Sequence, residues 1–268
     1  MKKNLLRICA AAVVLLLPAI VSAQRIERTI NEAWRFQRDG KSVEVVDIPH
    51  SWNCYDSVDD TPGYFRGVGL YEKVLRINET IDDHSFYLRF EGANQVTELW
   101  VNDNYVGKHI GGYSAFCFDI SGYLRQGNNA LKIKVDNSHN ADIPPLSADF
   151  TFFGGIYRDL NLIVTPKTHI STTHYASSGV YISTSELSDH SAKVELRTML
   201  TNNCAKKSVA FLCHKIVSPE GRVVREVKAK VALAPQTQNI EHIIGCFVEK
   251  PQLWSPDTPH LYKVYTSL

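Results

Sequence analysis

The sequence predicts an all-β protein built as two β-sandwiches in tandem. Short segments with alternating apolar and polar side chains recur along the chain, and clusters of Gly, Asn, Asp and Pro separate them. No amphipathic helical pattern longer than about two turns stands out, nor does any internal repeat. At 268 residues, the chain is long enough for two domains of ordinary size.

The first predicted domain covers residues 25–166, and its clearest local signal is a hairpin. Glu98–Val101 and Tyr105–Gly107 are two extended runs on either side of the turn Asn102–Asn104. Asn and Asp tolerate the positive φ angles that tight hairpin turns require. On the same periodicity, Trp100 and Phe90 are expected to be core residues rather than a stacking platform for a ligand.

Two further strands follow from strict alternation. Ala130–Asp136 places Leu131, Ile133 and Val135 on one face, and Gly127–Asn129 is expected to form the turn before it. The same pattern recurs at Leu160, Leu162 and Val164.

A domain boundary is expected at Pro166–Thr168, so the second domain covers residues 167–268. Short strands at regular spacing over roughly 100 residues are typical of a seven-stranded immunoglobulin-like sandwich. A turn at Ser218–Gly221 separates two of them. The predicted strands are Gly179–Ser183, Lys193–Thr198, Val209–Cys213 and Arg222–Val231.

Residues 1–23 are expected to be a cleaved signal peptide. Lys2, Lys3 and Arg7 precede the apolar run Ile8–Ile20, and Val21–Ala23 offers small residues for cleavage after Ala23. The run is shorter than the roughly 20 residues of a transmembrane helix, so we expect no membrane span and a periplasmic or secreted protein.

Five cysteines remain after the leader: Cys54, Cys117, Cys204, Cys213 and Cys246. Cys213 could pair with Cys204 or with Cys246 across neighbouring strands, and the sequence does not choose between them. The simpler expectation is that most are buried free thiols. There is no CxxC motif and no helical His pair, so we expect no metal site and no cofactor.

Charge and composition limit the classes of molecule that the protein is expected to bind. The 29 Lys and Arg residues nearly balance the 28 Asp and Glu residues, so there is no basic excess to neutralise a phosphate backbone. Nucleic acid is therefore not an expected partner. By contrast, Asp149–Leu162 combines an acid, an aromatic run, a Gly-Gly pair and an arginine in one loop. Aromatic faces beside a carboxylate are typical of sugar binding.

Several segments, in this order, resemble the family 2 glycoside hydrolases, which include β-galactosidases, β-glucuronidases and β-mannosidases. They are Ile48–Asn53, Gly63–Lys73, the run from Phe90 through Leu99–Asn102 to Ile120, Asp149–Leu162 and, in the second domain, Leu253–Tyr262. Leu70 departs from the pattern, since many members carry an aromatic residue there. The resemblance implies a jelly-roll, galactose-binding-like sugar-binding domain followed by an immunoglobulin-like domain, with Leu253–Tyr262 as its closing strand.

The resemblance also implies where the chemistry lies. Members of this family hydrolyse glycosides with two glutamates in a TIM barrel, which takes about 250 residues of its own. The sequence ends at Leu268, so we expect no catalytic residue in it. The leading hypothesis is the non-catalytic N-terminal part of an exported β-glycosidase, active only with a barrel, which a separate fragment could supply. Galactose, glucuronic acid and mannose are not distinguished.

Two residues are candidates for substrate binding. Asp149 matches a family aspartate six residues before Gly155, which the resemblance implies accepts hydrogen bonds from sugar hydroxyls. The alternative is a loop aspartate that caps a backbone N–H. Arg66 could face the substrate or Asp149, although an ion pair between the sheets would explain it equally well.

Other conspicuous residues are expected to be structural. Arg158 should pair with an acid inside the sandwich, and His50 should be a buried, hydrogen-bonded histidine. Of Phe150, Phe152 and Phe153, some should be buried under the Gly-Gly turn, and one could flank a sugar pocket.

Two other functions stay open. A free-standing carbohydrate-binding module would bind a sugar by itself, whereas a purely structural or partner-binding tandem sandwich would not.

Overall fold

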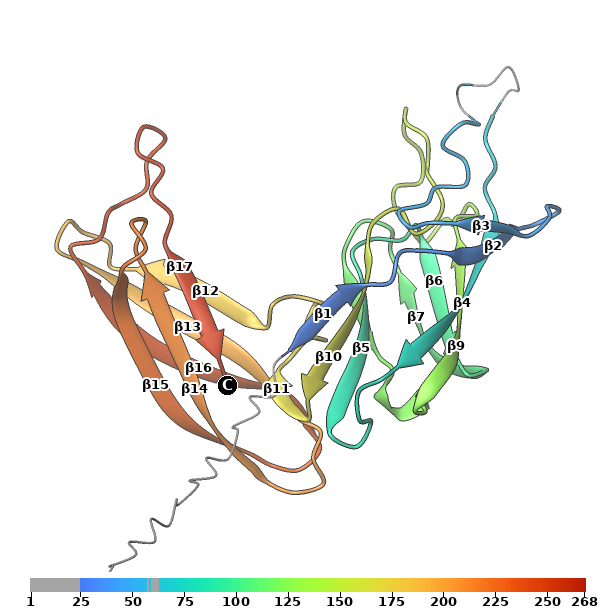
Figure 1. Cartoon of the computed structure of the whole chain (residues 1–268). Coiled ribbons are helices and arrows are strands. Elements are labelled where there is room, and N and C mark those ends of the chain that lie inside the picture. Colours follow the sequence, from blue (N-terminus) through green and yellow to red (C-terminus); the bar gives the residue numbers. More distant parts are fainter. Residues whose placement is uncertain (1–24, 57, 59–62) are drawn as a thin grey trace, which may run out of the picture.

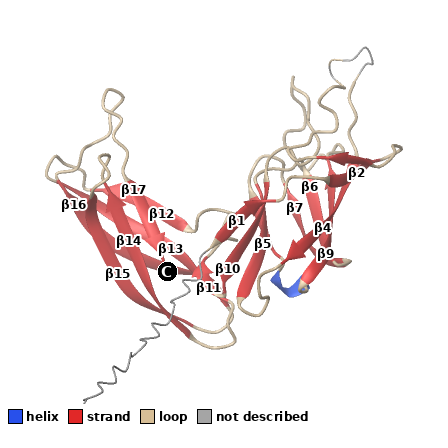
Figure 2. Cartoon of the chain, in the orientation of Figure 1, coloured by secondary structure: helices blue, strands red, loops and turns tan. Residues whose placement is uncertain are grey.

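The computed structural model describes residues 25–56, 58 and 63–268, and almost all of its regular structure is β-strand (Figures 1 and 2). The larger sheet of the first sandwich has six strands in the order β3-β2-β4-β9-β6-β7. These are β2 (Trp34–Arg38), β3 (Glu44–Val46), β4 (Val68–Ile77), β6 (Val96–Val101), β7 (Asn104–Ile110) and β9 (Gly127–Asp136).

A four-stranded sheet, in the order β1-β10-β5-β8, covers the inner face of the first. Its strands are β1 (Ile26–Thr29), β5 (His84–Phe90), β8 (Phe116–Asp119) and β10 (Leu160–Pro166), and the 3-10 turn η1 (Ser121–Tyr123) follows β8. One continuous apolar core, which includes Trp34, Phe36 and Phe90, fills the space between the two sheets. The burial of this core is the main stabilising contribution in the first sandwich.

The strands predicted from alternation are confirmed. Leu131, Ile133 and Val135 in β9 are all buried in the core. β6 and β7 form the predicted hairpin, and Asn102 and Asp103 in its turn have φ angles of 50° and 63°. Both central residues therefore have the positive φ that a two-residue hairpin turn needs. Gly127–Asn129, by contrast, belongs to β9 and is not a separate turn.

The second part of the chain, residues 167–268, is described throughout and contains seven strands. They are β11 (Thr168–Ile170), β12 (Val180–Ser185), β13 (Ser191–Asn202), β14 (Ser208–Val217), β15 (Val223–Leu233), β16 (Thr237–Glu249) and β17 (Lys263–Ser267). In one sheet β13 pairs with β11, β12 and β16, and in the other β14 lies between β15 and β17. The all-β class and the two sandwiches in tandem are therefore confirmed.

The two sandwiches meet through a small polar junction. The Tyr87 hydroxyl lies 2.9 Å from Nε2 of His169, and Nδ2 of Asn203 donates to the same hydroxyl at 3.1 Å. Nε of Arg89 donates to the carbonyl oxygen of Ala176 at 2.8 Å. Burial lowers the pKa of His169 to about 4, so this imidazole is neutral at pH 7.

Two expectations about the strands, for Leu253–Tyr262 and for Trp100, were wrong. Leu253–Tyr262 is a loop, because Pro256 and Pro259 have no N–H to donate to a ladder, and the strand β17 begins only at Lys263. Trp100 is only half-buried: it lies on the outer face of β6, where it packs against Tyr105 with ring centroids 5.4 Å apart.

None of the five cysteines pairs with another. Only Cys246 is fully buried and Cys54 is exposed, so the expectation of mostly buried thiols was also wrong. The predicted signal peptide lies outside the described residues. Within them, no helix is long and apolar enough to cross a membrane.

Candidate functional site

Three loops of the first sandwich extend beyond its sheets on the same side of the molecule (Figure 1). They follow β3, β7 and β9, and their described residues are 47–56, 58 and 63–67 in the first loop, 111–115 in the second and 137–159 in the third. Residues 111–114 and 142–144 line a shallow cavity of about 440 Å³ between the second and third loops. The candidate site lies at this end of the sandwich, because the residues singled out in the sequence lie on the first and third loops.

Asn53 connects the first loop to the third. Its Nδ2 donates to the carbonyl oxygens of Phe65 and Phe152, each at 3.1 Å, and its Oδ1 accepts from the Gly154 N–H at 3.0 Å. The side chain is completely buried. Three satisfied hydrogen bonds in a solvent-free position fix the relative placement of the two loops.

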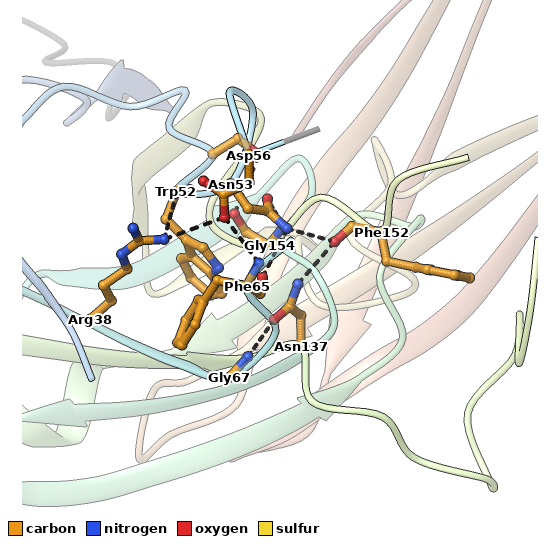
Figure 3. Close-up of polar contacts among 10 residues, drawn as sticks. Arg38, Trp52, Asn53, Asp56, Phe65, Gly67, Asn137, Phe152 and Gly154 are labelled. Carbon is orange, nitrogen blue, oxygen red and sulfur yellow. Dashed lines mark hydrogen bonds and ion pairs between the residues drawn. The ribbon is translucent and has the colours of Figure 1, made fainter. Parts of the chain in front are cut away.

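The side-chain amide of Asn137, on the third loop, also connects the two loops by hydrogen bonds (Figure 3). Its Nδ2 donates to the Phe152 carbonyl oxygen at 2.9 Å, and its Oδ1 accepts from the Gly67 N–H at 2.8 Å. The Phe152 carbonyl therefore accepts from both asparagines, Asn53 and Asn137. At the edge of the network Asp56 accepts from the Phe65 N–H at 2.9 Å.

Glycine is required at positions 154 and 155 because atoms of the first loop and of neighbouring residues lie very close to the backbone there. A Cβ at Gly154 would overlap the Trp52 ring and the Asn137 amide. Gly155 has a φ of 126°, and a Cβ there would meet the His50 backbone carbonyl. Only glycine fits both positions, because it has no Cβ and tolerates positive φ. The third loop thus returns tightly against the first before β10 begins.

Asp149 lies on the third loop, three residues before Phe152. Its side chain is exposed and forms no hydrogen bond or ion pair with any of the described residues. The alternative role of capping a backbone N–H is therefore not observed in this part of the chain. The carboxylate faces solvent, where it can accept hydrogen bonds from another molecule.

Arg66 is held beside the third loop. Its Nε donates to the Asn137 carbonyl oxygen at 2.7 Å, and its guanidinium carbon lies 4.8 Å from the centroid of the Phe152 ring. It has no ion pair with Asp149, or with any other acid among the residues that the structure describes. The alternative ion pair between the sheets is thus not formed, and the outer N–H groups of Arg66 remain available as donors.

The neighbouring aromatic residues divide as expected. Phe152 is buried, whereas Phe150 and Phe153 are 53% and 44% exposed. Phe150 and Phe152 pack together with ring centroids 5.3 Å apart. Phe150 and Phe153 therefore present exposed aromatic faces near Asp149 in the sequence.

His50 is half-buried and hydrogen-bonded, whereas Arg158 is exposed. Nδ1 of His50 lies 2.8 Å from the Tyr71 hydroxyl, and burial lowers the pKa of His50 and raises the pKa of Tyr71. Arg158 is exposed and forms no ion pair with a described acid, so the predicted pairing inside the sandwich was wrong. It lies in a bend before β10, over the ring of Tyr157, 5.9 Å from the centroid.

No group of three or more His, Cys, Asp or Glu side chains in the described ranges could hold a metal ion. The residues that sequence reasoning missed are Asn53 and Asn137. Asn137 is a single polar residue in a loop, and Asn53 ends the Ile48–Asn53 segment; in neither case do the neighbouring residues show that the amide side chain is buried.

Comparisons with family profiles and with individual known proteins agree with each other. The profile of the sugar-binding domain of glycosyl hydrolases family 2 matches residues 22–166, and a second family 2 profile matches residues 169–268. A β-glucuronidase from Bacteroides fragilis is 34% identical over 259 residues, which are 95% of this chain and 37% of the relative. A β-galactosidase from Thermoanaerobacter pseudethanolicus is 30% identical over 247 residues, 91% of this chain and 32% of the relative.

Among solved structures, β-glucuronidase 2 from Bacteroides uniformis superposes with a TM-score of 0.84 at 33% identity. The superposition covers 91% of this chain and 30% of that protein. The chain therefore spans about a third of the length of the relatives that it matches.

Proposed function

Because the chain belongs to glycosyl hydrolase family 2, we propose that it is the non-catalytic, substrate-orienting part of an exported β-glycosidase. The observation that carries this proposal is the exposed Asp149 carboxylate on a loop that buried hydrogen bonds hold in place. We also propose that the division into domains falls at residues 166 and 167, with a jelly-roll sugar-binding domain before it and the immunoglobulin-like domain after it.

The proposed role of the loop that carries Asp149 is to bind the sugar of the substrate. An ionised carboxylate only accepts hydrogen bonds, and its two oxygens suit a pair of vicinal sugar hydroxyls. Arg66 would supply donors on the same side, because its outer N–H groups are not used within the described chain. The curated relatives named above are β-glucuronidases and β-galactosidases, and an arginine suits a glucuronic acid carboxylate as well as a neutral hydroxyl.

Hydrolysis itself needs other residues. Retaining glycosidases place two carboxyl groups about 5–5.5 Å apart. We assign no catalytic residue to this chain and propose that β-glycosides are cleaved only when the two sandwiches are joined to a (β/α)₈ barrel. That barrel would belong to the same polypeptide or to a separate fragment, and a bound substrate would lie between it and Asp149.

The export of the protein is inferred from residues 1–23. The basic start, apolar run and small residues before Gln24 support cleavage after Ala23 and a periplasmic or secreted location.

The test is to fuse the two sandwiches to the barrel of the Bacteroides fragilis relative and to measure hydrolysis of nitrophenyl glucuronides and galactosides. Asp149→Ala should lower kcat/KM by about 10- to 100-fold, because it removes charge-assisted hydrogen bonds. Asp83→Ala, which changes an exposed aspartate in the turn between β4 and β5, is the control. Equal kcat/KM for Asp149→Ala and the parent fusion would overturn the assignment of Asp149.

A free-standing carbohydrate-binding module is the second candidate, and the exposed Phe150 and Phe153 faces favour it. Calorimetric titration of the chain with millimolar glucuronides and galactosides distinguishes the two. Heat of binding that disappears in Phe150→Ala would support the module, and the absence of heat would support the enzyme-part proposal.

A further inference from the structure

The outer face of the six-stranded sheet carries an aromatic pair that lies outside the core. Trp100 on β6 is half-buried and Tyr105 on β7 is 49% exposed, and their rings pack edge to face with centroids 5.4 Å apart. Nζ of Lys132 on β9 lies 5.8 Å from the centroid of the Trp100 ring. A tryptophan held between two neighbours on a solvent-facing strand offers a fixed apolar surface to another molecule.

Strand register extends this pair into a row of side chains across the sheet. Trp100 is paired with Lys132, and Lys132 is paired with Glu72 on β4. Glu72 is in turn paired with Arg35 on β2. Paired residues of antiparallel strands point to the same face, and neighbouring strands lie about 4.8 Å apart, so roughly 14 Å separates Trp100 from Arg35. A single sugar cannot contact both ends of this row, whereas an oligosaccharide can.

The charged members of the row are available to bind a ligand. Lys132, Glu72 and Arg35 are all exposed, and none of them forms an ion pair or a side-chain hydrogen bond with a residue in the described part of the chain. In the next row, by contrast, Lys134 and Glu98 form an ion pair at 3.0 Å. Unpaired charged groups can hydrogen-bond to sugar hydroxyls, while an aromatic face packs against the C–H groups of a sugar ring.

Basic side chains outnumber acidic side chains on this face. Strand register places three acidic and five basic residues on it: Glu72, Glu98 and Asp136, and Arg35, Arg76, Lys108, Lys132 and Lys134. The resulting excess of positive charge at pH 7 favours a ligand that carries carboxylates.

The face is directed away from the second sandwich. Tyr87 and Arg89, which contact the second sandwich, both lie on β5 of the four-stranded sheet. In Figure 1, β1, β5 and β10 lie on the side of the second sandwich, and β2, β4 and β9 lie on the far side. The row is also separate from Asp149, which lies on a loop at the end of the sandwich and not on a sheet face.

We propose that the row from Tyr105 to Arg35 is a second carbohydrate-binding surface, which binds a linear glycan that contains uronic acids. One sugar ring would pack against Trp100 and Tyr105, with its carboxylate beside Lys132. The following rings would hydrogen-bond to Glu72 and Arg35, because a guanidinium binds a carboxylate or a pair of hydroxyls through two N–H groups. Such a surface would hold the protein on a polymer without taking part in hydrolysis. It does not depend on the role proposed for Asp149.

The test is calorimetric titration of the whole chain with oligosaccharides of hyaluronan, alginate and polygalacturonate. At least one of them should bind, and should bind more tightly than glucuronic acid alone, because only an oligosaccharide spans the row. Tyr105→Ala and Arg35→Ala, at opposite ends of the row, should each weaken this binding by about three- to tenfold. No binding of any of the three oligosaccharides would overturn the proposal.

Two control variants localise the effect. Tyr265→Ala removes a 59% exposed tyrosine of the second sandwich, and Arg76→Ala removes an exposed arginine on the same face but outside the row. Both should bind the oligosaccharide as the parent does. A loss in Arg76→Ala equal to that in Arg35→Ala would contradict a defined row, since it would show diffuse attraction to a basic face.

Two further measurements exclude other ligands of this face. Polyglutamate is a linear polycarboxylate without sugar rings, and its binding should be weaker and unaffected by Tyr105→Ala. Equal affinity for polyglutamate and for the oligosaccharide would overturn the assignment to carbohydrate. Self-association in sedimentation velocity that Tyr105→Ala abolishes would overturn it in favour of a second copy of the chain. None of these readouts involves hydrolysis, so a failed assignment of Asp149 would leave the result unaffected.

Discussion

The Gly154 N–H donates to the buried Oδ1 of Asn53 at 3.0 Å, and the two residues are 101 positions apart in the sequence. This bond joins the loop after β3 to the loop that carries Asp149. The position of the exposed Asp149 carboxylate thus depends on a contact that contains no charge and no exposed atom. Four predictions follow from this network, from the junction of the sandwiches and from the cysteines.

Asn53→Ala should lower the free energy of unfolding by about 3 kcal/mol, because it leaves the Gly154 N–H and one or more buried carbonyls without partners. Urea denaturation, followed by tryptophan fluorescence, measures the change. Hydrogen exchange of residues 146–153 should also become faster. Asn128→Ala removes an exposed asparagine whose side chain forms no hydrogen bond with the described residues, and should change neither quantity. Equal stability of the two variants would contradict the network.

Gly154→Ala should destabilise the first sandwich by about 1–3 kcal/mol, since the added methyl group overlaps the Trp52 ring and the Asn137 amide. Gly122→Ala is the control, because a Cβ at Gly122 would meet no atom within 4 Å. Thermal unfolding of both variants gives the two Tm values to be compared. A Tm for Gly154→Ala equal to that of Gly122→Ala would show that the loops are not packed as described.

Stability should decrease as the pH falls from about 6.5 to about 4, and His169 should account for part of this change. Burial lowers the pKa of His169 from 6.5 to about 4. Between these values the unfolded chain binds a proton that the folded chain does not, so acid favours unfolding, by at most about 3 kcal/mol. The stabilising effect is complete above pH 6.5.

His169→Gln should flatten this pH dependence, because glutamine can still accept from the Tyr87 hydroxyl but does not titrate. Urea denaturation at several pH values provides the measurement, with the exposed His190→Gln as control. Burial also lowers the pKa of His50, His109 and His214, so part of the slope should persist. A slope unchanged by His169→Gln would exclude His169 as a contributor.

The cysteines should react as free thiols at very different rates. Cys54 is exposed, whereas burial raises the pKa of Cys117 to about 12 and so suppresses the reactive thiolate. With a chromogenic disulfide reagent at pH 8, Cys54 should react first and Cys117 only after denaturation. Cys54→Ser should remove the fast phase. Fewer than five thiols in the denatured mature protein, without reductant, would reveal a disulfide.

The agreement between sequence and structure is best where the signal is local. The alternation at Leu131, Ile133 and Val135 identified β9, and Asn102 and Asp103 identified the hairpin turn, because side-chain period and positive φ are properties of neighbouring residues. Trp100 was assigned to the core because alternation identifies two faces of a strand but not which face is covered. Arg158 was misplaced because it lies in a bend before β10, where its side chain is exposed and no described acid lies within ion-pair distance.

What the sequence by itself determined was the class of the protein: strands in two sandwiches, the family to which they belong, and the loop that carries Asp149. Only the tertiary structure decided that Asn53 and Asn137 hold this loop, and that Arg66 binds the Asn137 carbonyl and not Asp149. The physical reason is distance along the chain. Hydrogen bonds and packing between residues far apart depend on which strands pair, and the local alternation of side chains does not identify the partner strand.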